Sequence, residues 1–401
     1  MLVVNGQHTS RSGCPVRMLL LALLMFVPTR LSKNITAEEN LYLKEHCGDR
    51  FLNHTEPLRL KRSLGGILAK QNEFPWIAAF YLRDKATLKI LWGCSGVQIS
   101  PQHVLTAAHC VVKNNEVLYR RVCIRQEIVP HTTLQDLYII QNPALFTLFI
   151  GSGCTNPKHC MNNRTNYSIV NIIVYEDYNH CLRLNDLAIL EITPNISSKD
   201  GSPVCMPEQS DELMYNLTAV GFGIDPSSTP KPYSLLNLSD LRYVELYKAS
   251  FKFNNTIAAV HPNRSVCEGD SGGPLVQPRN EDANYTVEGL AVRAFPECED
   301  PPMSEERVSL FVDLRKFLDW ICLHTGVCPL PHTDVASAIT QMTTLSTTTI
   351  NTTTTHLTTE GEVIIGIAQE LNTSTSNTTT TERRTQHDGR YLFTNNRSSH
   401  W

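Results

Sequence analysis

The sequence predicts an all-β fold, an antiparallel sandwich or barrel that is followed by one C-terminal helix. Short apolar runs alternate with Gly, Pro and Asn between about residues 63 and 328, which is typical of strands joined by turns. No helical pattern separates these runs, and this argues against a parallel sheet. The expected strands are residues 76–82, 104–107, 187–192, 219–222 and 290–294. Leu314, Phe317, Leu318 and Ile321 then fall on one helical face and predict the final helix.

Length and composition set the broad class. The chain has 401 residues, a formal net charge of −4 and 18% charged residues. That charge excludes a nucleic-acid binder that depends on bulk basicity, so no nucleic-acid partner is expected. The apolar fraction of 41% excludes an acidic disordered chain, because it can build a core. At about 150 residues per domain, the length allows two or three domains, or one large domain with appendages.

The N-terminus has the pattern of a secretion signal. Residues 18–27 are apolar and follow Arg11 and Arg17. This run is shorter than the ~20 residues that span a bilayer, and a buried core helix is the alternative interpretation. We expect a signal peptide over residues 1–32, with Met18 as an alternative start, and a secreted, extracellular protein. Fourteen Asn-x-Ser/Thr sequons support a secreted glycoprotein.

The C-terminal residues 329–401 have a Thr-rich composition. Thr accounts for 18 of the 42 residues between Thr340 and Thr381, and such a segment cannot bury enough apolar surface to fold. The composition is typical of an O-glycosylated, mucin-like tail, and a plain disordered linker is the alternative. No apolar segment of membrane length follows, so no membrane span is expected.

Three segments carry the residue types of nucleophilic catalysis. His109 lies in the run Leu-Thr-Ala-Ala-His-Cys, Asp186 precedes an apolar run, and Ser271 lies in Gly-Asp-Ser-Gly-Gly-Pro. Serine is a poor nucleophile until a base takes its proton, and histidine can be that base near neutral pH. A buried carboxylate fixes the imidazole tautomer, and glycines let backbone N–H groups approach an oxyanion. Each residue alone has an ordinary structural interpretation, but the three together favour acyl transfer.

These motifs resemble the chymotrypsin/trypsin-like serine endopeptidases over about residues 47–328. The resemblance implies two antiparallel Greek-key β-barrels with the site between them and a C-terminal helix. It implies that Ser271 is the nucleophile, His109 the general base and then acid, and Asp186 the carboxylate that orients the imidazole. The backbone N–H groups of Gly269 and Ser271 would form the oxyanion hole. A protein or peptide substrate and a monomer are expected, with no cofactor and no metal.

A narrower resemblance lies before the protease region. The segment Glu39-Asn40…Cys47-Gly48 precedes the protease region, and similarity outside the motifs is low. In both respects the sequence resembles a divergent nematode branch of the family.

The resemblance also implies a zymogen. Family members are cleaved to expose a new N-terminus, usually Ile-Val-Gly-Gly, whose amine pairs with the Asp before the nucleophile. The sequence Ser-Leu-Gly-Gly from Ser63 stands in that place, so Asp270 would pair with the Ser63 amine. Before it, Arg-Leu-Lys-Arg ends at Arg62 and has the form cut by furin-like convertases, with an ordinary exposed basic run as the alternative. We therefore expect an activation propeptide over residues 33–62 and a protease domain over residues 63–328.

The 13 cysteines predict a disulfide framework, because Cys14 is lost with the signal and an even number remains. The resemblance implies the bridges Cys94–Cys110, Cys267–Cys298 and Cys47–Cys205. A further disulfide of the family is missing, because Leu217 and Gln277 stand in place of its two cysteines. The connectivity is left open for the remaining cysteines, which are Cys123, Cys154, Cys160, Cys181, Cys322 and Cys328. A zinc site is the alternative, which secretion disfavours.

The specificity pocket departs from the family. By position, Ser265 lies at the base of the primary pocket, where trypsins carry Asp, so a strong preference for Arg or Lys is not expected. Val292, Arg293 and Ala294 replace Ser-Trp-Gly in the strand that pairs with the substrate backbone. Arg307 takes the place of a pocket-lining Gly. An acidic preference, a restricted pocket and weak activity all stay open.

Two functions follow from these features. The first is a secreted serine endopeptidase with a Ser-His-Asp mechanism, made as a zymogen. The second is a catalytically weak homologue that acts as a binding or adhesive glycoprotein. The intact set of catalytic residues favours the first. The altered pocket favours the second, as does Ser63, whose small side chain gives up about 1.5–3 kcal/mol of burial in the activated state.

Overall fold

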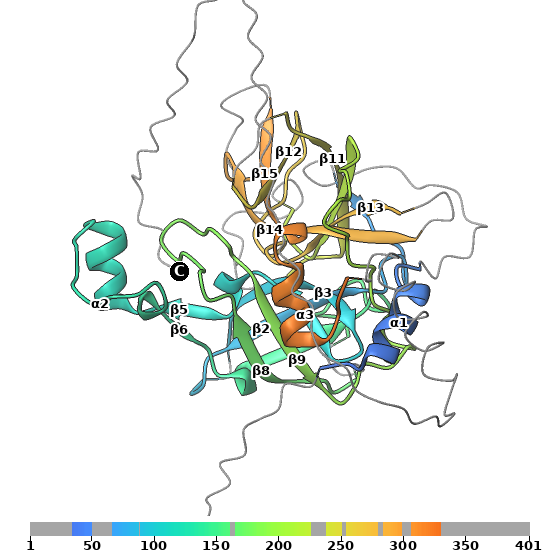
Figure 1. Cartoon of the computed structure of the whole chain (residues 1–401), viewed down its shortest axis with the longest axis horizontal. Helices are drawn as coiled ribbons and strands as arrows, with labels where there is room; N and C mark the ends of the chain where they lie inside the picture. The colour runs from blue at the N-terminus through green and yellow to red at the C-terminus, as the bar shows by residue number, and fades with distance from the viewer. Residues whose placement is uncertain are drawn as a thin grey trace, which may run out of the picture. The chain divides into compact units, whose positions relative to one another are not determined.

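The structure is a computed structural model that describes residues 34–49, 66–87, 89–160, 165–225, 238–250, 254–279, 284–298 and 306–329 (Figure 1). The chain divides into the units Met1–Ala336 and Ser337–Trp401, and every described residue belongs to the first. The expected signal peptide, the cleavage residues Arg62 and Ser63, and the Thr-rich tail beyond residue 329 lie outside the described residues.

Strands are the main regular secondary structure of the described chain, and its helices are short. The helical segments are α1 (Ala37–His46), η1 (Ala108–Cys110), α2 (Glu116–Tyr119), η2 (Arg120–Ile124), η3 (Gln135–Leu137), η4 (Pro143–Leu145), η5 (Leu314–Lys316) and α3 (Leu318–Thr325). The strands up to Thr193 are β1 (Ile67–Leu68), β2 (Ile77–Arg83), β3 (Ile90–Ser100), β4 (His103–Thr106), β5 (Val112–Asn114), β6 (Tyr138–Ile140), β7 (Phe146–Ile150), β8 (Ser168–Val174) and β9 (Ala188–Thr193). The later strands are β10 (Asn216–Gly221), β11 (Arg242–Lys248), β12 (Thr256–His261), β13 (Pro274–Pro278), β14 (Tyr285–Phe295) and β15 (Arg307–Asp313).

Two antiparallel sheets carry the fold. The first has the strand order β7-β2-β3-β4-β9-β8. In the second, the order is β11-β10-β13-β14-β15-β12, and β12 pairs back onto β11, so six strands close into a barrel with β1 added to β11. A closed barrel, a half-barrel and a short C-terminal helix confirm the predicted trypsin-like all-β class. The expected strands correspond to β2, β4, β9, β10 and β14.

One apolar cluster joins the two sheets. Ile77 and Leu105 from the first sheet share it with Val220 and Leu290 from the second, and all four are at most 3% exposed. Ile321 of α3 belongs to the same cluster and is fully buried. Because each of these side chains loses its water contact only when both sheets are present, their burial fixes the two sheets against each other.

The C-terminal helix forms in two pieces. The expected helical face begins in η5, where Asp313 caps the turn by accepting the backbone N–H of Arg315. The backbone then breaks at Phe317, and α3 continues to Thr325. The apolar residues Leu314, Phe317 and Ile321 are still buried together. No helix within the described ranges is long and apolar enough to cross a membrane.

Helix α1 lies inside the expected propeptide. Thr36 and Glu39 form a capping box, with Glu39 N–H donating to Thr36 Oγ1 at 3.1 Å and Thr36 N–H donating to Glu39 Oε2 at 2.7 Å. Ile35 N–H donates to the Thr325 carbonyl at 2.8 Å. Asn40 Nδ2 donates to the Cys328 carbonyl at 3.1 Å. The segment around α1 is therefore hydrogen-bonded to the end of α3 and to the residues that follow it.

Candidate active site

His109 and Asp186 form a hydrogen-bonded pair at one end of the first sheet. β4 ends at Thr106, which lies opposite Ala188 at the start of β9, so the residues that follow β4 and precede β9 meet. Asp186 Oδ2 lies 2.6 Å from His109 Nδ1, and Asp186 Oδ1 accepts the backbone N–H of His109 at 2.8 Å. Asp186 is fully buried. Nδ1 therefore donates to the carboxylate, which leaves Nε2 as the proton acceptor.

The surroundings of this pair favour an ionised Asp186 and a neutral His109. Burial lowers the pKa of His109 against the raising effect of the Asp186 charge, and the charges of Arg183 and Arg293 lower it further. Burial acts to raise the pKa of Asp186, but the charge and hydrogen bonds of His109 outweigh it, and this pKa lies below its ordinary value. These are the protonation states that a general base needs at neutral pH.

Ser271 lies in the turn before β13, and β14 holds this turn on one side. Gly272 N–H donates to the Ala291 carbonyl at 2.7 Å, and Ala291 N–H donates to the Gly273 carbonyl at 2.9 Å. Gly269 and Gly272 have φ angles of +94° and +76°, which side-chain-bearing residues rarely adopt. The glycines that flank Ser271 are therefore required by the shape of the turn.

Ser95 of β3 holds the same turn from the first sheet. Its N–H donates to the Ser271 carbonyl at 2.9 Å, and its Oγ donates to the Gly269 carbonyl at 2.8 Å. The same Oγ accepts the N–H of Phe222 at 3.0 Å. Ser95 is fully buried, so it ties the Ser271 turn to both sheets through bonds that water does not weaken.

The turn packs against the strand end that leads into His109. A Cβ added to Gly272 would collide with the Thr106 hydroxyl and would lie 2.8 Å from the Ala107 nitrogen. Ala107 lies two residues before His109 in the chain. This contact places the Ser271 turn beside the segment that leads into His109.

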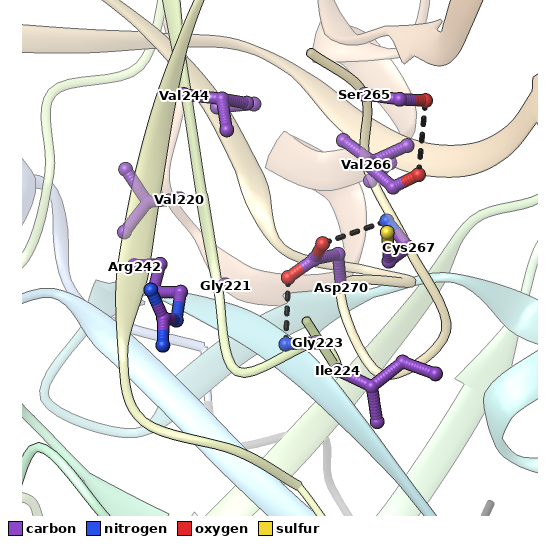
Figure 2. Close-up of a pocket in the computed structure, with 12 residues that line it drawn as sticks. Val220, Gly221, Gly223, Ile224, Arg242, Val244, Ser265, Val266, Cys267 and Asp270 are labelled. Atoms are coloured by element: carbon purple, nitrogen blue, oxygen red, sulfur yellow. Dashed lines mark hydrogen bonds between the residues drawn. The ribbon is translucent and has the colours of Figure 1, made fainter. Parts of the chain in front are cut away.

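Asp270 lies beside a cavity that Figure 2 shows in close-up. Its Oδ1 accepts the Gly223 N–H at 2.7 Å, and its Oδ2 accepts the Cys267 N–H at 2.8 Å. Burial raises the pKa of Asp270 to about 6, against the lowering effect of these two N–H groups and of the Arg242 charge. A cation in this cavity would therefore stabilise the ionised form of Asp270.

The cavity has a volume of about 30 Å³, which is room for one or two water-sized groups. Its lining includes Gly223, Ile224, Arg242, Val244, Ser265 and Cys267. β1 runs antiparallel to β11, with Ile67 opposite Tyr243. Gly66 precedes Ile67, so the antiparallel register directs it toward Val244, which lines the cavity.

The residues expected at the primary pocket are mostly buried. Ser265 is 4% exposed, and its Oγ donates to the Val266 carbonyl at 3.1 Å and lies 3.4 Å from Ser309 Oγ. Arg307, the first residue of β15, is 5% exposed, and its Nη1 donates to the Glu297 carbonyl at 3.4 Å. The guanidinium of Arg307 is thus turned into the protein, toward the loop that ends at the Cys267–Cys298 bridge.

The strand segment expected to pair with substrate contains an irregularity. The register between β14 and β15 shifts between Ala291 and Arg293. Val292 is buried, Ala294 is half-buried and the Arg293 side chain is exposed. The Arg293 guanidinium lies 5.4 Å from the centre of the Phe295 ring.

Six disulfides bind the described chain. Three are the pairs that the resemblance implies, Cys47–Cys205, Cys94–Cys110 and Cys267–Cys298. The pairs left open by the sequence are Cys123–Cys181, Cys154–Cys160 and Cys322–Cys328. Cys94 and Cys110 lie close to His109, but their sulfurs are bonded to each other and offer no thiolate to a metal.

Sequence reasoning missed two residues of this site. Ser95 directly follows Cys94 in the chain, but nothing local shows that its hydroxyl reaches Gly269 in the other sheet. Arg183 had a visible signal, because it lies three residues before Asp186 in the same loop.

Comparison with known proteins decides the family. The profile of the nematode trypsin-6-like family matches residues 17–328. The chain belongs to this family. It is 26% identical over 324 residues to CLIP domain-containing serine protease B8 of Anopheles gambiae, covering 74% of this chain and 73% of that protein. It is 24% identical over 278 residues to chymotrypsin-C of Bos taurus, covering 66% and 90%. It is 27% identical over 254 residues to venom serine protease Bi-VSP of Bombus ignitus, covering 58% and 60%.

Proposed function

We propose that this member of the nematode trypsin-6-like family is a secreted serine endopeptidase that hydrolyses peptide bonds through an acyl-enzyme. The observation that carries the proposal is the buried His109–Asp186 pair, with Nε2 free, at the strand end on which the Ser271 turn packs. The serine proteases among its relatives support the same class of chemistry.

In the proposed reaction, His109 Nε2 takes the proton of Ser271 Oγ as this oxygen bonds to the carbonyl carbon of the cleaved peptide bond. The imidazolium, stabilised by Asp186, gives that proton to the departing amine as the C–N bond breaks. A water then loses a proton to the same nitrogen, attacks the acyl ester and releases the acid, and the proton returns to Ser271. The backbone N–H groups of Gly269 and Ser271 stabilise the oxyanion in both halves.

Activation follows cleavage after Arg62 by a furin-like protease. Ser63 lies three positions before Gly66, and at about 3.3–3.6 Å per residue the new N-terminus can reach the cavity beside Asp270. The Ser63 ammonium would pair with the Asp270 carboxylate there. Breaking such a buried pair costs about 3–5 kcal/mol, enough to hold the turn that presents Gly269.

The propeptide stays attached after this cleavage. Cys47–Cys205 links it covalently to the protease region, and α1 is hydrogen-bonded to residues near the C-terminal helix. Six disulfides fit an oxidising compartment. Sequon asparagines that are exposed in the described chain support glycosylation; they are Asn34, Asn166, Asn195, Asn216, Asn254 and Asn263. We propose that the protein acts as a monomer with a mucin-like tail over residues 329–401.

The second function, a weak homologue that acts as a binding glycoprotein, is favoured by one observation. The Arg307 side chain is turned into the protein near the expected primary pocket, where a glycine is usual in the family. A primary pocket filled by Arg307 would accept only a small or acidic substrate side chain, or no side chain at all.

Labelling with an active-site serine phosphonate separates the two functions. In protein whose N-terminus is shown to be Ser63, the enzyme proposal expects one adduct on Ser271. Ser271→Ala should abolish the adduct and lower kcat by about 10⁶-fold. An unlabelled Ser271 in folded, cleaved protein supports the binding glycoprotein instead.

A further inference from the structure

Two arginines border the His109–Asp186 pair from opposite sheets. Arg183 lies three residues before Asp186, in the loop that leads into β9. Arg293 lies in β14, two residues after Ala291, whose backbone bonds hold the Ser271 turn. Both charges are close enough to lower the pKa of His109, and the Arg183 charge also lowers the pKa of Arg293. By their positions in the loop before β9 and in β14, both arginines therefore lie next to the candidate site.

Neither guanidinium is neutralised by a direct partner. Within the described ranges, no hydrogen bond and no ion pair involves the side chain of Arg183 or Arg293. Asp186 is already bonded to His109. Glu297 is the acidic residue whose charge is felt at Arg293 besides Asp186, and it is exposed. One of these two carboxylates is bonded to His109 and the other is exposed, so the two arginines still favour the approach of an anionic group.

The loop that carries Arg183 is held in a fixed conformation. Cys181 is bonded to Cys123 on η2, and Asn179 N–H donates to the Leu184 carbonyl at 2.9 Å. Arg183 itself has a φ of +52°, an unusual value for a residue with a side chain. A backbone that keeps such an angle is determined by its surroundings, so the backbone position of Arg183 is fixed.

The loop is also held from the second sheet and from the preceding turn. Asn255 Nδ2 donates to Asn185 Oδ1 at 3.0 Å, and Asn185 Nδ2 donates to the Asp177 carbonyl at 3.1 Å. Asn185, like Arg183, has a positive φ, of +53°. These bonds fix the loop on both sides of Arg183 without using its guanidinium.

We propose that Arg183 and Arg293 form a cationic subsite that selects substrates with an acidic side chain on the N-terminal side of the cleaved bond. The inference rests on the proposed function, because it assigns a substrate preference to the same site. Arg293 belongs to the segment that, by resemblance, pairs with substrate backbone. A guanidinium binds a carboxylate through two parallel N–H···O bonds, a geometry that a neutral or basic side chain cannot supply.

The test compares peptide phosphonates that differ only in one residue, Glu, Gln or Lys, placed in turn at the second, third and fourth positions before the reactive group. The readout is the second-order rate of Ser271 labelling in the cleaved full chain. At one or more positions we expect Glu to react about tenfold faster than Lys at low salt, with Gln between them. In about 1 M NaCl, where the Debye length is about 3 Å, this ratio should shrink.

Variants assign the preference to these residues. Arg183→Gln and Arg293→Gln should each lower the Glu-to-Lys ratio, and the double variant should bring it close to one. Arg183→Lys keeps the charge and should keep most of the preference. Arg120→Gln removes an exposed arginine from the neighbouring turn η2 and should leave the ratio unchanged.

The outcomes separate the two proposals. If neither the charged series nor an uncharged phosphonate labels Ser271, the proposed function fails and the subsite fails with it. If the uncharged phosphonate labels Ser271 but Glu gains nothing over Lys at any position, only the subsite is overturned. An acidic preference that survives in the double Gln variant also overturns it, because other residues then carry the preference.

Discussion

The two halves of the candidate site are assembled in different ways. His109 and Asp186 come from one sheet, where adjacent strands and two hydrogen bonds at 2.6 and 2.8 Å complete the pair. Ser271 comes from the other sheet, and its turn depends on Ser95 across the interface and on Asp270 beside a cavity. The His109–Asp186 pair is thus complete in this structure, whereas in the proposed function cleavage after Arg62 adds a contact to the Ser271 turn.

The largest expected effect comes from disrupting the His109–Asp186 pair. Asp186→Asn removes the carboxylate that fixes the His109 tautomer, and the amide would present the wrong group to Nδ1. Labelling of Ser271 and peptide hydrolysis should fall by about 10⁴-fold, with the fold retained. Asp177→Asn is the matched control, because Asp177 is exposed in the same region and contributes its backbone carbonyl to Asn185. Equal losses in both variants would contradict the role given to Asp186.

A second experiment loosens the loop before Asp186 without changing the His109–Asp186 pair. Replacing Cys123 and Cys181 together by Ser removes a bridge with a sequence separation of 58. The free energy of unfolding should fall by about 2–4 kcal/mol. Labelling by an uncharged phosphonate should stay nearly unchanged, because the hydrogen bonds to His109 hold Asp186 directly. A labelling rate that collapses in folded protein would show that the pair needs this bridge.

A third experiment tests the half that depends on cleavage. Arg62→Ala should leave an uncut chain, in which burial raises the pKa of Asp270 from 3.8 to about 6. A carboxyl group whose pKa is higher in the folded state stabilises that state when it is protonated. The stabilisation by Asp270 is therefore complete below about pH 4 and is lost as the pH rises through about 6. The uncut chain should lose up to about 3 kcal/mol of unfolding free energy from this group between about pH 4 and pH 8.

The cleaved protein should lose less over the same range, because the Ser63 ammonium pairs with the ionised carboxylate. Denaturant unfolding at both pH values measures the difference. Asp270→Asn in the uncut chain is the control, since it removes the titrating group. Identical pH profiles for cut and uncut protein would contradict the pairing of Ser63 with Asp270, and a mature N-terminus at Ser63 in Arg62→Ala would contradict the cleavage site.

The smallest expected effect concerns the contact between the halves. Ser95→Ala leaves the Phe222 N–H and the Gly269 carbonyl without their shared partner, at a cost of about 1–3 kcal/mol. Labelling of Ser271 should slow by about tenfold, because the turn that presents Gly269 is less well held. Ser198→Ala, an exposed position outside the sequons, should change neither stability nor labelling. A Ser95→Ala protein that labels at the full rate would show that β14 alone fixes the turn.

The same contrast explains what could be predicted from sequence. His109, Asp186 and Ser271 stand in short local motifs, and the expected strands follow from apolar periodicity. The role of Ser95 depends on a contact across two sheets, to Gly269, that no local pattern records. Cys123–Cys181 was open for the same reason, because tertiary structure decides that η2, which carries Cys123, approaches the loop that carries Cys181.

Local signals account for two further differences. α1 lies in the expected propeptide, and its start was readable as a capping box at Thr36 and Glu39. The final helix breaks at Phe317 although its apolar spacing is regular, because η5 is a separate turn capped by Asp313. Periodicity therefore identified the buried face there, while capping decided where the helix begins.

The central claim is that Ser271 is an activated nucleophile, and intact-mass analysis after phosphonate labelling tests it most directly. The protein should be the full cleaved chain with Ser63 shown to be its first residue. We predict a single adduct that maps to Ser271 and is absent from Ser271→Ala and strongly reduced in Asp186→Asn. Folded, cleaved protein that forms no adduct on Ser271 would contradict the account.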